Sequence, residues 1–149
     1  MSRHQLAQIN VARLLAPIDA PETADFVAAL EPVNARADRS PGFVWRLQTE
    51  SGDATSVQAF DDPLVIVNLT VWESIEALEA FAYREASHLA VLRRRREWFE
   101  RHTEAPTVLW WVPTGHIPSV AEALDRLALL RAEGPSARAF TFRERFPAP

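Results

Sequence analysis

A β-strand that runs directly into a capped helix is encoded by residues 64–81, LVIVNLTVWESIEALEAF. The segment 64–72 is rich in β-branched side chains and alternates between two faces, which predicts a strand. One face carries valines and Leu69, whereas the other carries Asn68, Thr70 and Trp72. Ser74 precedes apolar residues at helical spacing, so we expect it to cap a helix that begins where the strand ends.

Similar patterns on both sides of this segment predict the remaining elements. They indicate three further strands, at 4–14, 43–48 and 107–112. Other helices are expected to begin at Asp19, with a kink at Pro32, and at Ser119, with a stop at Gly134.

Three segments complete this prediction. The helix after Ser74 is expected to break near 85–87 and then to resume as far as about His102. The polar segment 49–63 would form a long hairpin connection, and residues 138–142 can add a short edge strand.

The order β-α-β-β-α-β, followed by an extra helix and a short strand, is that of one ferredoxin-like α+β domain spanning 1–149. In this layout the helices cover one face of the sheet, and we expect a second copy of the chain to cover the other. The predicted assembly is therefore a homodimer built on sheet faces, that is, a dimeric α/β barrel.

The composition excludes several classes of protein. The chain has 149 residues, 48% of them hydrophobic, which suffices for one domain with a substantial core. It contains no cysteine, and all 16 basic residues are arginine, so thiolate metal sites and lysine-anchored pyridoxal chemistry are excluded. The four glycines lie far apart, which leaves no phosphate-binding loop.

Location and partners can be predicted in a similar way. No basic leader and no apolar stretch of about 20 residues is evident, so we expect a cytoplasmic protein with no membrane partner. The net charge of -4 argues against nucleic-acid binding. No pair of histidines with a carboxylate has the spacing of a zinc or non-haem iron site, so no metal is expected.

Polar side chains at alternating strand positions predict a shared polar face. If the faces of the strands coincide, these residues would line the interior of the barrel and either satisfy one another or bind a ligand. They are Gln8, Asn10, Arg46, Gln48, Asn68 and Thr70.

Tryptophan is unusually frequent in this small domain, and we expect most of the indoles to lie in the core; the alternative is that at least one stacks on a flat ligand. The five are Trp45, Trp72, Trp98, Trp110 and Trp111. Because Trp110 and Trp111 are adjacent in a strand, they must point to opposite faces. The predicted pocket contains Trp45, Trp72, Trp98 and Trp111 together with Tyr83 and His116, although His116 also suits a purely structural turn.

Arg93 to Arg96 would cover most of the circumference of one helix, so at least one is expected to turn inward or along an interface, and an inward arginine could bind an anion. The alternative is a solvated face that pairs with Glu97 and Glu100. His88 shares a helical row with Arg95, and it is the predicted acid–base residue; the alternative is a partly exposed or satisfied core side chain without a catalytic role.

Two sets of motifs resemble known families. Thr70-Val71-Trp72-Glu73-Ser74, with Ala77 and Pro41-Gly42-Phe43, resembles the dimeric α/β-barrel superfamily of antibiotic-biosynthesis monooxygenases and haem-degrading oxygenases. A closer likeness to the family called domain of unknown function 3291 covers nearly the whole chain. It is carried by HQLAQINVARL, NARADRSPGFVWRLQ, VNLTVWES, LRRRREWF, LWWVPTGHIPSVAEA and AFTF.

The resemblance also bears on haem. Haem-degrading relatives carry an Asn on the first strand, which Asn10 matches, and a Trp and an iron-ligating His on the second helix. Phe81 and Val91 occupy the places of that Trp and that His, and His88 lies one turn earlier.

Three functions are compatible with these residues. The first is a cofactor-free enzyme of the monooxygenase, cyclase or lyase type that acts on an apolar or aromatic molecule. Its predicted base is His88, its anion stabiliser is Arg95 or Arg46, and Asn10 and Asn68 orient the substrate. The alternatives are a haem protein with His88 as axial ligand, and a ligand-binding dimer without catalysis.

Overall fold

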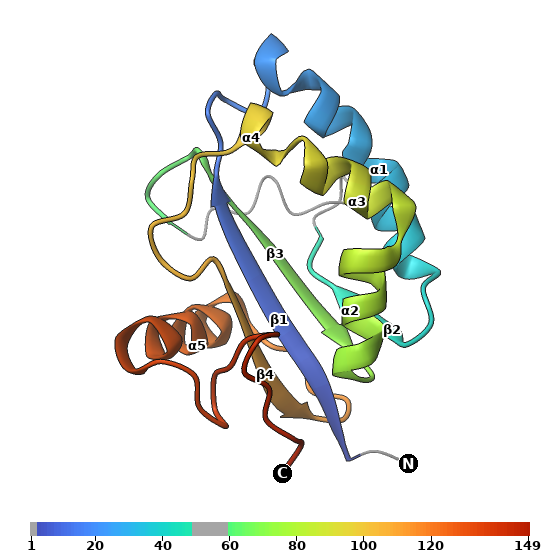
Figure 1. The fold of residues 1–149 in the computed structure, drawn as a ribbon, viewed down its shortest axis with the longest axis vertical. Coiled ribbons are helices and arrows are strands. Elements are labelled where there is room, and N and C mark those ends of the chain that lie inside the picture. The colour runs from blue at the N-terminus through green and yellow to red at the C-terminus, as the bar shows by residue number, and fades with distance from the viewer. Residues whose placement is uncertain (1–2, 49–59) are drawn as a thin grey trace.

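A four-stranded antiparallel sheet forms the centre of the molecule (Figure 1). The computed structural model describes residues 3–48 and 60–149. The strands lie in the order β2-β3-β1-β4, and they are β1 (His4–Arg13), β2 (Phe43–Arg46), β3 (Val65–Trp72) and β4 (Thr107–Pro113). One helical connection follows β1 and another follows β3, so the predicted ferredoxin-like topology is confirmed.

The helices begin largely where the capping residues predict. Ser74 accepts a hydrogen bond from the Ala77 backbone N–H at 3.1 Å, and Ser119 caps the last helix in the same way. The first helix differs, because its opening turn is a 3-10 turn that follows Ala20 rather than a helix capped by Asp19. The helical elements are η1 (Pro21–Thr23), α1 (Ala24–Asp38), α2 (Ile75–Arg84), α3 (Ala86–Arg93), α4 (Arg95–Trp98) and α5 (Val120–Glu133).

The second helical region is more fragmented than predicted. The expected break occurs at Glu85, whose carboxylate caps α3 by accepting the His88 backbone N–H at 3.0 Å. A second break at Arg94 separates α3 from α4, and helical structure ends at Trp98 instead of near His102. Residues 86–102 therefore do not form the single helix on which the predicted row of side chains depended.

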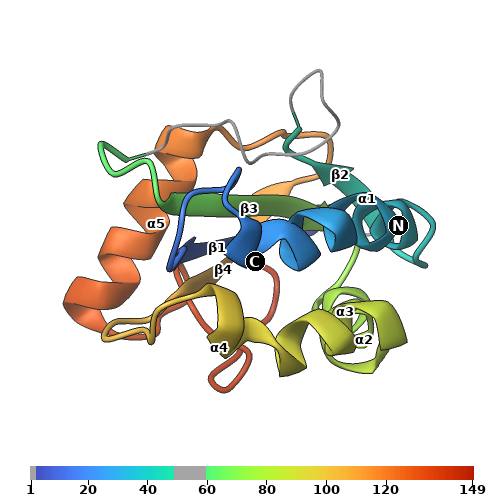
Figure 2. The same ribbon diagram turned by 90° about the horizontal axis from the view of Figure 1, so that it is seen from above.

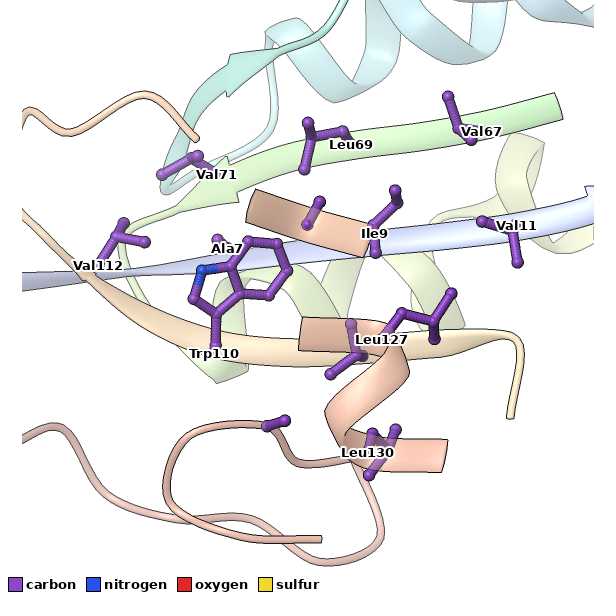
Figure 3. Close-up of a cluster of buried hydrophobic side chains, with 13 residues drawn as sticks. Ala7, Ile9, Val11, Val67, Leu69, Val71, Trp110, Val112, Leu127 and Leu130 are labelled. Atoms are coloured by element: carbon purple, nitrogen blue, oxygen red, sulfur yellow. The ribbon is translucent and has the colours of Figure 1, made fainter. Parts of the chain in front are cut away.

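The two faces of the sheet carry different helices (Figure 2). Ala7, Ile9 and Val11 of β1 point toward α5 and form a buried cluster with it (Figure 3). The alternate residues of β1, beginning with Leu6, point toward α1 and α2. The prediction that helices cover only one face is wrong, because α5 packs on the other. The homodimer remains a prediction, but an uncovered sheet face no longer supports it.

A tight turn explains why two of the family-like motifs occur together. Gly42 has φ +81°, a conformation that favours glycine, and a Cβ at this position would lie 2.5 Å from the Ala77 Cβ. The Gly42 carbonyl accepts the Glu73 backbone N–H at 2.7 Å. The turn before β2 thus packs against the junction of β3 and α2 and is hydrogen-bonded to it.

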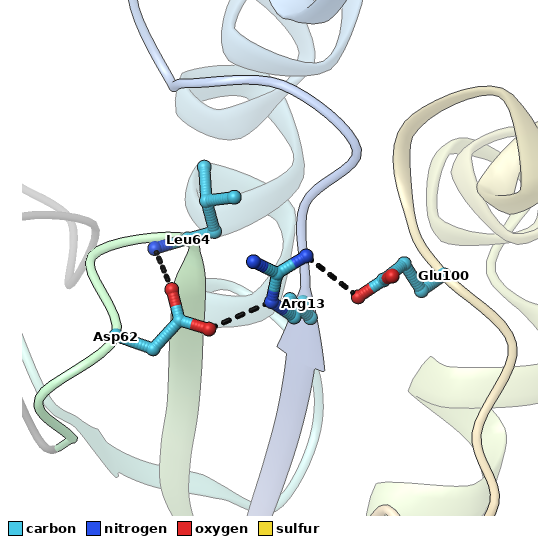
Figure 4. A network of polar contacts seen from close by, with 4 residues as sticks. All are labelled: Arg13, Asp62, Leu64 and Glu100. Carbon is cyan, nitrogen blue, oxygen red and sulfur yellow. Dashed lines mark hydrogen bonds and ion pairs between the residues drawn. The ribbon is translucent and has the colours of Figure 1, made fainter.

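Arg13 ties the end of β1 to two other segments (Figure 4). Its guanidinium donates to Asp62 at 2.7 Å and to Glu100 at 2.9 Å. Asp62 also accepts the Leu64 backbone N–H, and the hydrogen bond from Arg13 is the main cause that lowers the pKa of this carboxyl.

Two peripheral predictions are settled only in part. The expected edge strand at 138–142 is reduced to a single bridge between Phe140 and Leu109, while most of the polar connection at 49–63 lies outside the described residues. Within residues 3–48 and 60–149, no helix is long and apolar enough to cross a membrane.

Candidate functional site

The polar side chains of the strands form two adjacent rows across the sheet. Asn10 of β1 pairs with Asn68 of β3 on one side and with Thr107 of β4 on the other. In the next row, Gln8 pairs with Thr70. The predicted common polar face is therefore confirmed, but it is the face toward α1 and α2 and not the face expected to meet a second chain.

The row of Gln8 and Thr70 is buried and hydrogen-bonded. The Gln8 side-chain amide donates to Asn68 Oδ1 and to Thr70 Oγ1, both at 2.8 Å. Thr70 Oγ1 also accepts the Trp72 indole N–H at 2.8 Å. These bonds connect Gln8, Thr70 and Trp72, and they hold the Asn68 amide oxygen in place.

The neighbouring row, which contains Asn10 and Asn68, is accessible to solvent. Asn10 is half-buried, and Asn68 is exposed although it lies in the middle of a central strand. The Asn10 amide nitrogen donates to Thr107 Oγ1 at 2.7 Å. Among the described residues, nothing accepts from the Asn68 side-chain nitrogen and nothing donates to Asn10 Oδ1. One donor and one acceptor are therefore left for a ligand.

Apolar residues flank the open row on both sides along the strands. Beyond Gln8 and Thr70, the next row of the same face contains Leu6, Trp72 and Trp111. In the other direction, Ile66 packs against the cluster formed by Leu14, Phe26 and Trp98. We use the name amide cleft for the polar group between these apolar regions, which lies apart from the hollow over α3 and α4 and the hollow beside α5. It comprises Gln8, Asn10, Asn68, Thr70 and Thr107.

Thr107 is a site residue that the sequence did not reveal, because its position indicated only the start of a strand. Its hydroxyl holds the Asn10 amide, and only the register between β1 and β4 brings the two together.

Arg46 reaches the same face beside Thr70. Its guanidinium forms an ion pair with Asp38 at 2.7 Å, and only 11% of its side chain is exposed. Because this charge is already balanced by a carboxylate, Arg46 is a poorer anion stabiliser than predicted.

His88 lies at the start of α3 and is half-buried. Its Nδ1 is 2.7 Å from the Ala82 carbonyl oxygen, so Nδ1 carries the proton and Nε2 is the free acceptor. Burial lowers the pKa of the ring, which keeps it neutral at pH 7. The ring packs against Phe81, which in turn stacks on Trp72, so aromatic contacts connect His88 to the core beside the amide cleft.

The arginine run does not behave as one helical face. Arg93, Arg94, Arg95 and Arg96 are all exposed, so none of them turns inward within this chain, while a position along an interface stays a prediction. The helix breaks at Arg94, so the angular spread of a continuous helix does not apply. For the same reason, His88 and Arg95 do not share a helical row.

Several residues assigned to the predicted pocket lie elsewhere. A bulge between Phe43 and Trp45 turns Trp45 to the face that carries α5, although alternation predicted that the two would share a face. Trp98 is buried under Arg94, and Tyr83 is exposed and contacts Phe142.

The remaining two predicted pocket residues also have other partners. Trp111 lies on the face of the amide cleft, as predicted opposite to Trp110, but its indole donates to the Phe146 carbonyl oxygen at 2.8 Å. His116 lies 2.6 Å from Glu122, which also accepts the Trp110 indole N–H. Burial would raise the pKa of Glu122, but these hydrogen bonds outweigh it and lower that pKa. His116 thus anchors the start of α5.

Binding of a metal or a haem group would depend on which ligating side chains lie together. Within the described ranges, no three His, Asp or Glu side chains gather as a metal site. Nδ1 of His88 is hydrogen-bonded to a carbonyl oxygen, as is common for iron-ligating histidines, and the ring packs against Phe81 with centroids 4.9 Å apart. His88 does not line the hollow over α3 and α4 or the hollow beside α5.

Comparison with known proteins places the chain in a family. The family model described as domain of unknown function (DUF3291) matches residues 5–149. The chain belongs to the DUF3291 family. No match is found among curated proteins.

Solved structures share the fold of this DUF3291 chain at low identity. A putative antibiotic biosynthesis monooxygenase from Nitrosomonas europaea is 17% identical with a TM-score of 0.51, over 80% of this chain and 98% of that one. The protein PA3566 from Pseudomonas aeruginosa is 15% identical with a TM-score of 0.50, over 78% and 98%. SnoaB from Streptomyces nogalater, a cofactor-independent oxygenase, is 17% identical with a TM-score of 0.48, over 77% and 98%. The first two likenesses support the fold assignment.

Proposed function

We propose that this chain binds a small apolar or aromatic molecule in the amide cleft and converts it without a cofactor, as a monooxygenase-, cyclase- or lyase-type enzyme. The observation that carries the proposal is the unused amide donor of Asn68 beside the unused acceptor of Asn10, at an exposed place in the centre of the sheet. Polar groups of this kind within apolar surroundings orient a ligand more than they add affinity.

The two asparagines suit a molecule that carries both a carbonyl and a hydroxyl group. Asn68 would donate to the carbonyl oxygen, and Asn10 would accept from the hydroxyl group. If the substrate loses a proton, the same donor stabilises the negative oxygen that results. Gln8 fixes the orientation of Asn68, and Thr107 fixes that of Asn10, so little reorganisation is required.

His88 is proposed as the base that removes this proton. Its neutral ring at pH 7 and its free Nε2 support the role. For an oxygenase reaction, dioxygen is the co-substrate: anthrone and O2 would give anthraquinone and water, with the ring carbon oxidised and one oxygen atom reduced to water. The likeness in fold to a protein named as a putative antibiotic biosynthesis monooxygenase supports this class.

Binding is tested by quenching of tryptophan fluorescence. The probe is a hydroxyl-substituted anthrone, which carries both a carbonyl and a hydroxyl group and is referred to as anthrone from here on. Loss of one hydrogen bond costs about 0.5–1.5 kcal/mol, so Asn68→Ala and Asn10→Ala should each raise the Kd about 2- to 10-fold. Gln5→Ala is the matched control, because this amide lies on β1 but pairs with Val112 of the α5 face. Unchanged binding in both asparagine variants would refute the amide cleft as the site.

Catalysis is tested separately, by oxygen consumption and by the appearance of anthraquinone. Turnover that falls in the asparagine variants but not in Gln5→Ala supports the enzyme. Binding of anthrone without any conversion would instead favour the non-catalytic ligand-binding protein.

A further inference from the structure

The junction of α3 and α4 carries a surface hollow with an unusual lining. Its volume is about 280 Å³, and its walls are Leu89, Leu92, Arg93, Arg95 and Arg96. We call it the arginine hollow. All of its residues belong to α3 and α4, so a ligand in this hollow would bind independently of the function proposed for the amide cleft.

The three arginines of the hollow have no acidic partner in the part of the chain that the structure describes. Among the described residues, Arg93, Arg95 and Arg96 form no hydrogen bond or ion pair, whereas Arg94 between them bonds to Asp25 and Glu97. The break at Arg94 turns that one side chain away over Trp98.

The nearby carboxylates form ion pairs with other arginines. Glu97 pairs with Arg94, Glu100 with Arg13 and Glu104 with Arg131. The positive charge of the hollow also affects His102. Burial lowers the pKa of this histidine, and the charge of Arg95 lowers that pKa further. The hollow is therefore a place of unbalanced positive charge, although the whole chain has a net charge of -4.

The leucines provide the apolar part of the lining. Leu89 and Leu92 are half-buried, yet neither packs into one of the three buried clusters. Both are only partly exposed, unlike a side chain that inserts into a membrane. A concave site with apolar walls and guanidinium groups suits a small molecule that has one anionic end.

We propose that the arginine hollow binds an anionic amphiphile, in which a carboxylate or phosphate group is attached to a short apolar chain. The anionic group contacts Arg93, Arg95 and Arg96, and the chain lies against Leu89 and Leu92. At about 30 Å³ for each heavy atom of a small molecule, taken from the volume of a water molecule, 280 Å³ accommodates about nine such atoms. This is close to the size of octanoate.

The test uses octanoate as the probe. Its binding is monitored through the arginine side-chain N–H signals in NMR spectra. We expect the signals of Arg93, Arg95 and Arg96 to shift in a saturable manner. Octanol lacks the charge and acetate lacks the chain, so each should bind at least tenfold more weakly. Equal binding of octanol or acetate would overturn the proposal.

Substitution provides the second arm. The triple variant R93Q/R95Q/R96Q should weaken octanoate binding at least tenfold. The matched control R84Q/R101Q/R143Q removes the same charge from exposed arginines outside the hollow and should change binding less than twofold. Equal losses in both variants would show only nonspecific attraction, and they would refute the site.

Two further comparisons distinguish the sources of the anion. Tighter binding of octyl phosphate than of octanoate would assign the site to phosphorylated amphiphiles, and the reverse order would assign it to carboxylates. Cosedimentation with phosphatidylglycerol vesicles, without octanoate binding, would overturn the small-molecule site in favour of a membrane surface. Failure of any of these arms leaves anthrone binding in the amide cleft unaffected, so the two proposals fail separately.

Discussion

Thr70→Val tests the buried hydrogen-bond network behind the amide cleft. The Thr70 hydroxyl oxygen accepts from both Gln8 and Trp72, each at 2.8 Å, and Trp72 is 1% exposed. Valine has nearly the same shape but cannot accept either bond. The indole N–H would then be buried without a partner, whereas the Gln8 amide would keep its bond to Asn68.

The expected cost is the sum of three contributions. An unsatisfied buried donor costs about 1–3 kcal/mol, and loss of the Gln8 bond costs about 1 kcal/mol. The additional buried methyl group of valine stabilises the folded state by about 1 kcal/mol. Thr70→Val should therefore lower the free energy of unfolding by about 1–3 kcal/mol, which corresponds to a decrease in Tm of about 2–12 °C for a chain of this length.

Urea unfolding at 25 °C measures this change as a shift in midpoint with an unchanged slope. A double-mutant cycle with Trp72→Phe identifies its origin, because removal of the indole donor should cost less when the acceptor is already absent. A Thr70→Val protein within 0.5 kcal/mol of the wild type, or a cycle without coupling, would show that these bonds do not stabilise the fold.

Other substitutions test neighbouring groups. Trp72→Ala should lower the free energy of unfolding by about 3–5 kcal/mol, because it removes a buried indole; loss of anthrone binding at an unchanged Tm would contradict this. The hydrogen bond from Ser87, with smaller ones from the His88 backbone and Arg36, lowers the pKa of Glu85 to about 2. The contribution of the ionised Glu85 carboxylate to stability should therefore be complete above the unfolded pKa of about 4.5 and be lost as the pH falls toward 2. The Tm values of the wild type and of Glu85→Gln should converge across this range. A constant difference between the two Tm values would refute the assignment. His88→Ala should leave the protein folded and lower any activity by about 10²–10⁴, and haem titration should give no Soret shift; global unfolding of the variant, or a shift that the variant abolishes, would exclude the role of base.

Local patterns along the chain predicted most of the individual elements. Alternation in residues 4–14 correctly placed Gln8 and Asn10 on the same side of their strand, and alternation in 64–72 did so for Asn68 and Thr70. The reason is that the strand repeat is a property of each backbone segment alone. Ser74 and Ser119 likewise indicated two helix starts, since a cap involves only residues within one turn.

The composition of the amide cleft depended on pairing between distant segments. The register of β1 with β3 and β4 made the two polar faces one surface and added Thr107, and no spacing within one segment contains that information. The bulge after Phe43 turned Trp45 to the opposite face for the same reason.

The sequence by itself determined that this chain forms strands and helices in ferredoxin-like order, because hydrophobic periodicity and capping are local. Only the tertiary structure decided that α5 covers the second face of the sheet, and that a break at Arg94 leaves three arginines without acidic partners among the residues described. Both outcomes depend on which surfaces compete for burial and for charge, and that competition exists only once distant segments have come together.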